Sequence, residues 1–121
     1  MYTLHMKEKS LSELKKYAVK IFTEYKKTGT VKWTYDIVAK DMSYQVGSLI
    51  KRIMQYRNER YADGLNKKEI KAHIADELAD IITEVLFISH ELDIDISQAW
   101  EDMAQSDKKK IASRSTNKAK K

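Results

Sequence analysis

The chain has 121 residues, with no proline, no cysteine and three glycines. This length fits one domain with a single core, and the scarcity of turn-forming residues favours helices. Without cysteine the chain forms neither disulfides nor thiolate metal sites, and no run approaches the roughly 20 apolar residues of a membrane-spanning helix. The first ten residues lack the apolar run of a secretory signal, so we expect a cytoplasmic protein with no membrane segment.

The net charge of +5 is concentrated near the C-terminus. Residues 106–121 hold seven Lys or Arg and one acidic residue, so residues 1–105 carry a net charge of −1. A short basic end of this kind is typical of a solvated, disordered tail, and the nearly neutral body argues against nucleic acid as a partner. We therefore predict one domain over residues 1–114 and a basic, disordered tail over residues 115–121.

The first predicted helix starts after Ser10, because Glu13 follows at the spacing of a capping box. Apolar residues then recur at steps of three and four as far as Tyr25, and the helix should end before Gly29. A second stripe with the same period predicts another helix from about residue 35 to residue 56.

The third predicted helix begins at Asn66, where Glu69 completes another capping pattern, and it is about 25 residues long. A short connection after His90 leads into a fourth helix, capped by Asp95 or Ser97. Isolated helices of this length are marginal in water, so the four should pack their apolar stripes together. The predicted fold is thus all-α, a four-helix bundle.

Three residues of this predicted bundle need a packing partner. Gly47 lies in the middle of the second helix, where it costs about 1 kcal/mol relative to alanine, so we expect a neighbouring helix to approach it closely. Trp33 and Trp100 are interpreted as core or interface anchors in preference to base-stacking platforms.

Four polar residues follow one side of the third predicted helix: His73, Glu77, Asp80 and Glu84 are spaced by four, three and four residues. Glu77 borders the apolar face, where an unpaired carboxylate is costly. One interpretation is a structural ion pair or a solvated helix edge. The other is a divalent cation held by Glu77 and Asp80, since Mg²⁺ commonly takes one or two carboxylates plus substrate phosphates.

Basic residues gather near the end of the second predicted helix and after it. Lys51 and Arg52 lie on that helix, and Arg57 and Arg60 follow in the loop. Each alone is typical of a solvated charge. Together they could neutralise a polyphosphate.

The run DELADIITEVLFISHELDID, residues 76–95, resembles the second signature of the MazG-like nucleotide pyrophosphohydrolases. That signature is a Glu-x-x-Asp pair on a long helix, followed by a short turn into a further helix. The pair here is Glu77 and Asp80.

The run YQVGSLIKRIMQ, residues 44–55, is similar to the first signature of the same family, in which two neighbouring Glu and a third Glu flank a Val-Gly. Tyr44, Gln45 and Ser48 occupy those three positions, so the acids of this signature are replaced. The resemblance spans about residues 35–114.

The resemblance implies a MazG-type fold and Mg²⁺-dependent hydrolysis of a nucleoside triphosphate, NTP or dNTP, to monophosphate and pyrophosphate. Mn²⁺ is a possible substitute for Mg²⁺. The implied metal ligands are Glu77 and Asp80, with Gln45 in support. Asp41 and Glu84, one turn away on the same two helices, are second choices that could restore negative charge.

The implied phosphate contacts are Lys51, Arg52 and Arg114, the last at a basic helix end like that of the family. No catalytic side chain is assigned. Because family members assemble with sites near subunit contacts, and because the apolar stripes are wide, we expect a homodimer or homotetramer.

The replaced acids leave a second hypothesis open. A catalytically weak or inactive MazG-like relative could use the same helices as a nucleotide-binding or protein-interaction module. The neutral Gln45 and Ser48 favour this hypothesis, whereas the retained Glu77 and Asp80 oppose it.

Overall fold

The computed structural model describes residues 8–119, which form four helices and no strand. In chain order the helices are α1 (Leu11–Lys26), α2 (Tyr35–Tyr56), α3 (Lys67–Glu91) and α4 (Ile96–Ala119). The predicted all-α class is confirmed for this part of the chain. None of these helices is long and apolar enough to cross a membrane, as far as the described residues go.

Local sequence signals set the starts of three helices. Ser10 with Glu13, and Asn66 with Glu69, form complete capping boxes at the starts of α1 and α3. At the start of α4 the Asp95 carboxylate accepts a hydrogen bond from the backbone N–H of Gln98 at 3.1 Å. These side chains satisfy N–H groups that have no partner within a helix, which explains why the predicted and observed starts agree.

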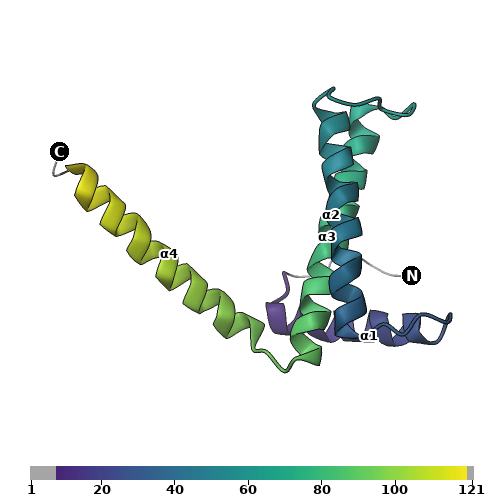
Figure 1. Cartoon of the computed structure of the whole chain (residues 1–121), viewed down its shortest axis with the longest axis horizontal. Helices are drawn as coiled ribbons and strands as arrows, with labels where there is room; N and C mark the ends of the chain where they lie inside the picture. Colours follow the sequence, from purple (N-terminus) through teal and green to yellow (C-terminus); the bar gives the residue numbers. More distant parts are fainter. Residues whose placement is uncertain (1–7, 120–121) are drawn as a thin grey trace.

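Helices α2 and α3 form a long antiparallel pair, and α1 crosses the end of that pair where α2 begins and α3 ends (Figure 1). The core lies at this crossing. Phe22 of α1, Val38 of α2 and Phe87 of α3 form a buried cluster, against which Trp33 packs. The rings of Phe22 and Phe87 are 4.4 Å apart between centroids. Packing at this crossing therefore fixes α1, α2 and α3 relative to one another at one end of the α2–α3 pair.

Helix α4 leaves the end of α3 and extends away from the α2–α3 pair (Figure 1). Its contacts are mainly with α1, and Trp100 and Ile111 remain 55% and 66% exposed. The expectation that all four stripes pack together is thus not met within one chain. Helix α4 packs mainly against α1, and apolar residues of α2 and α3 remain exposed.

Two further details differ from expectation. The predicted tail begins at residue 115, but α4 continues to Ala119, because a run without Gly or Pro has nothing to stop it. Residues 120 and 121 lie outside the described residues. A Cβ atom added at Gly47 would meet nothing within 4 Å in the described chain, so no neighbouring helix approaches it closely here.

Candidate functional site

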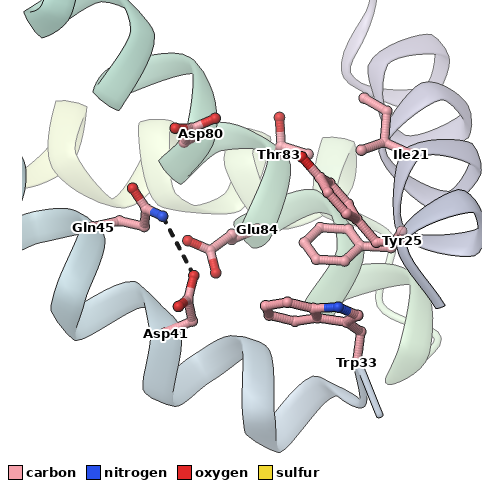
Figure 2. A pocket seen from close by; sticks show the side chains of 9 residues that line it. Ile21, Tyr25, Trp33, Asp41, Gln45, Asp80, Thr83 and Glu84 are labelled. Carbon is pink, nitrogen blue, oxygen red and sulfur yellow. Dashed lines mark hydrogen bonds between the residues drawn. The ribbon is translucent and has the colours of Figure 1, made fainter. Parts of the chain in front are cut away.

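A pocket of about 420 Å³ lies where α1, α2 and α3 meet. Helix α1 supplies one wall, Trp33 lies just before α2, and α2 and α3 form the opposite side (Figure 2). The lining residues are Ile21, Phe22, Tyr25, Trp33, Asp41, Gln45, Asp80, Thr83 and Glu84. The pocket therefore joins an aromatic end to a polar end.

The polar end is made by two turns of helix that face each other. Asp41 and Gln45 are four residues apart on α2, and Asp80 and Glu84 are four residues apart on α3. Each pair lies on one side of its helix because four residues make about one turn. The side-chain amide of Gln45 donates a hydrogen bond to Oδ2 of Asp41 at 3.4 Å (Figure 2).

Glu84 is the most unusual residue of the pocket. It is 4% exposed, and neither of its carboxyl oxygens has a hydrogen-bond partner among the described residues. Burial raises the pKa of Glu84 to about 8, and the facing carboxyl of Asp41 and the charge of Asp80 add to the shift. Glu84 therefore keeps its proton at neutral pH and can share it with Asp41.

Asp80 is shifted in the same direction for similar reasons. Burial raises the pKa of Asp80, and the nearby carboxylates of Asp76, Glu77 and Asp41 raise it further. A cation in this pocket would remove the mutual repulsion of these acids.

Glu77 lies outside the lining of the pocket that the described residues form, next to the α2–α3 contact. The hydroxyl of Ser48 donates a hydrogen bond to Oε1 of Glu77 at 2.8 Å, and Oε2 is buried with no partner in the described chain. The structure thus brings Gln45 and Asp80 into one pocket together with the second-choice acids Asp41 and Glu84. It places Glu77 opposite Ser48.

The three predicted phosphate contacts do not line this pocket within the described chain. Lys51 forms an ion pair with Asp63 in the α2–α3 loop at 3.7 Å. The guanidinium of Arg52 donates to Oε1 of Gln55 at 3.1 Å, next to the same loop. Arg114 is exposed on α4, which extends away from the α2–α3 pair (Figure 1).

The aromatic end was not predicted as part of a site. The ring of Trp33 is 5.8 Å from Phe22 and 6.2 Å from Tyr25 between centroids. Trp33 packs against the core, as expected for an anchor, and one side of it also lines the pocket. An apolar stripe does not reveal which of its aromatic residues border a cavity, so the sequence held no signal for this role.

The donor atoms of the polar end suit a hard cation, since carboxylate and amide oxygens are the ligands that Mg²⁺ prefers. In residues 8–119, however, no three His, Asp or Glu side chains are arranged so that they could hold a metal ion together. A Mg²⁺ that arrives with substrate phosphates needs only one or two carboxylates.

No family model, no curated protein and no solved structure matches the chain. The resemblance to the MazG-like family therefore stays a prediction that depends on the residues quoted from the sequence.

Proposed function

We propose that the protein is a Mg²⁺-dependent nucleoside triphosphate pyrophosphohydrolase of the MazG-like type, which converts an NTP or dNTP to its monophosphate and pyrophosphate. The observation that carries this proposal is the pocket of about 420 Å³ with acidic groups at one end and aromatic rings at the other. Pockets of this size hold small organic ligands, and a nucleotide has the same division between charged phosphates and a flat base.

The proposal gives each end of the pocket a role. Asp80 and the side-chain oxygen of Gln45 would hold Mg²⁺ together with the substrate phosphates, and Glu77 would add negative charge nearby. Bound Mg²⁺ supplies Lewis-acid polarisation of the phosphates and a water of lowered pKa. Tyr25 and Trp33 would stack on the base at the other end. Every nucleobase can stack in this way, because each has a flat π-face.

The proposal includes a homodimer or homotetramer, because positive side chains for the phosphates are not found at the pocket in the described chain. Helix α4 ends in a basic segment that includes Arg114 and extends away from its own body (Figure 1). In an assembly, this segment of one copy would lie near the phosphates bound by another. Exposed apolar residues on α2 and α3 support such an assembly.

A second function is favoured by the contact between Ser48 and Glu77. Because the hydroxyl of Ser48 occupies one oxygen of Glu77, that carboxylate is less available to a metal ion. Gln45 and Ser48 are also neutral where the family has acids. A protein of this kind would bind a nucleotide, or a protein partner, with little or no turnover.

Release of pyrophosphate from a panel of canonical and modified triphosphates, with Mg²⁺ or Mn²⁺, tests the proposal. We expect at least one substrate to be cleaved, and Asp80→Asn to lower kcat/KM by about 100-fold, as removal of one electrostatic contact to a reacting group does. Glu24→Gln is the control, because Glu24 is an exposed acid of α1 that does not line the pocket in the described chain. Tight nucleotide binding without cleavage would favour the second function. If nucleotides are neither bound nor cleaved, the enzyme and the nucleotide-binding module are both refuted.

A further inference from the structure

Within the polar end of the pocket, Asp41 and Glu84 are the residues that lie toward the aromatic end (Figure 2). Figure 2 shows Gln45 and Asp80 on one side of this pair, and Tyr25 and Trp33 on the other. Neither Asp41 nor Glu84 occupies an acid position of the family signatures, which place their acids at Glu77, Asp80 and the positions of Tyr44, Gln45 and Ser48. Neither residue is needed for the phosphate or base contacts of the proposed function.

Apart from the proton that Glu84 can share with Asp41, the two carboxyl groups have few donors in the described chain. Glu84 is 4% exposed and has no hydrogen-bond partner for either oxygen in the described chain, while Asp41 receives only the long contact of 3.4 Å from Gln45 there. A buried polar group without a protein partner is costly unless water, an ion or a ligand supplies the missing hydrogen bond. A ligand with a hydrogen-bond donor at this point of the pocket would satisfy the oxygens of Glu84 and Asp41.

A hydroxyl group meets this requirement better than other donors. It can donate to a carboxylate, and it can also accept from a protonated carboxyl, so it satisfies the pair whichever residue holds the proton. In a nucleotide the sugar lies between the phosphates and the base. With the phosphates at Asp80 and the base at Trp33, the sugar hydroxyls come opposite Asp41 and Glu84.

We propose that Asp41 and Glu84 bind the 2′- and 3′-hydroxyls of the nucleotide sugar, so that the site selects ribonucleotides over 2′-deoxyribonucleotides. This inference rests on the proposed function, which orients the nucleotide. Carboxylates contact ribose hydroxyls in the same way in dinucleotide-binding folds. A site built to hydrogen-bond a hydroxyl discriminates strongly against the analogue that lacks it, because the buried acceptors are then left unpaired.

The test compares pairs of ligands that differ only at the 2′ position. Binding of the α,β-imido analogues of ATP and dATP, and of CTP and dCTP, is measured by calorimetry on the full chain with Mg²⁺. These analogues are not cleaved, so binding is separated from turnover. We expect the ribonucleotide of each pair to bind at least about tenfold more tightly.

Substitutions then test whether the preference for ribose depends on Asp41 and Glu84. Glu84→Leu and Asp41→Ala should bring the ribose-to-deoxyribose ratio close to one by weakening ribonucleotide binding, whereas Asp76→Asn should leave the ratio unchanged. Equal binding of both sugars by the unaltered protein would overturn this inference and leave the nucleotide site intact. No binding of any nucleotide would overturn it together with the proposed function.

Discussion

Glu84 couples folding of the protein to pH. Its pKa is about 8 in the folded protein and close to the ordinary value of 4.5 in the unfolded chain. Between these values the unfolded chain has lost the proton while the folded protein retains it. The stability that this group contributes is therefore complete below pH 4.5, and it is lost as the pH rises towards 8.

Glu84→Gln should remove this pH dependence, because an amide does not titrate. At about 1.4 kcal/mol per pH unit, the variant should gain about 2 to 3 kcal/mol of unfolding free energy over the parent between pH 6 and pH 8.5. Urea denaturation at the two pH values measures the difference. Glu24→Gln, at an exposed acid of α1, is the control and should follow the parent. If the difference in unfolding free energy between Glu84→Gln and the parent is the same at both pH values, Glu84 has an ordinary pKa.

At the scale of elements, the contact between α2 and α3 decides whether acids can be restored to the site. Ser48 lies opposite Glu77, with 2.8 Å between the hydrogen-bonded oxygens, and Gln45 lines the same pocket as Asp80. A side chain at position 48 therefore points at α3, as the third acid of the first family signature would.

The double variant Gln45→Glu with Ser48→Glu should be less stable than the parent without metal, because the added carboxylates repel those of α3. It should gain more in Tm on addition of Mg²⁺ or Mn²⁺, since a ligand stabilises the state that binds it. Glu77→Gln in the same background should remove most of that gain. If calorimetry finds no larger metal response than in the parent, the proposed metal site is misassigned.

Helix α4 packs less against the other helices than α1, α2 and α3 do. Its packing against other helices is mainly with α1, and residue 115 is exposed. Removal of residues 115–121 should therefore leave folding unchanged, with a shift in Tm of less than about 1 °C, as is usual for changes at exposed positions away from the core. Circular dichroism melts and light scattering measure Tm and oligomeric state. A large fall in Tm would show that the end of α4 packs against a second copy.

For the whole molecule, large apolar side chains are exposed along two neighbouring helices, and contiguous exposed apolar residues mark interaction surfaces. Val46, Ile50 and Ile53 form a stripe on α2, and Leu78, Ile82 and Val85 form a similar stripe on α3, all at least partly exposed. Gly47, with open space beside it, adjoins the first stripe. A second copy of the chain would give that glycine the close neighbour that one chain lacks.

Ile82→Glu tests this assembly. Ile82 is 51% exposed in one chain, so a charge there should cost little in a monomer but should disrupt an apolar interface. We expect the parent to be a dimer or tetramer by light scattering, and the variant to shift to the monomer mass. Tyr61→Ser is the control, because Tyr61 is 90% exposed in the α2–α3 loop, and it should keep the parent mass. A monomeric parent would refute the assembly.

The sequence by itself determined the helices. Capping boxes at Ser10 and Asn66 and apolar residues at steps of three and four act within a few residues, so the predicted starts agree with the observed ones. The same periodicity showed that Asp80 and Glu84 share one side of α3, since that geometry is internal to a helix.

Only the tertiary structure decided which helix faces meet. The antiparallel pairing of α2 with α3 brings Asp41 opposite Glu84, and the crossing of α1 closes the pocket beside them and Trp33. The same pairing leaves Lys51 and Arg52 bound to residues near the far loop. It also leaves α4 apart from α2 and α3. These contacts join residues as distant in the sequence as Trp33 and Glu84. Their geometry depends on how side chains fill the core at Phe22 and Phe87, and no local sequence pattern encodes that packing.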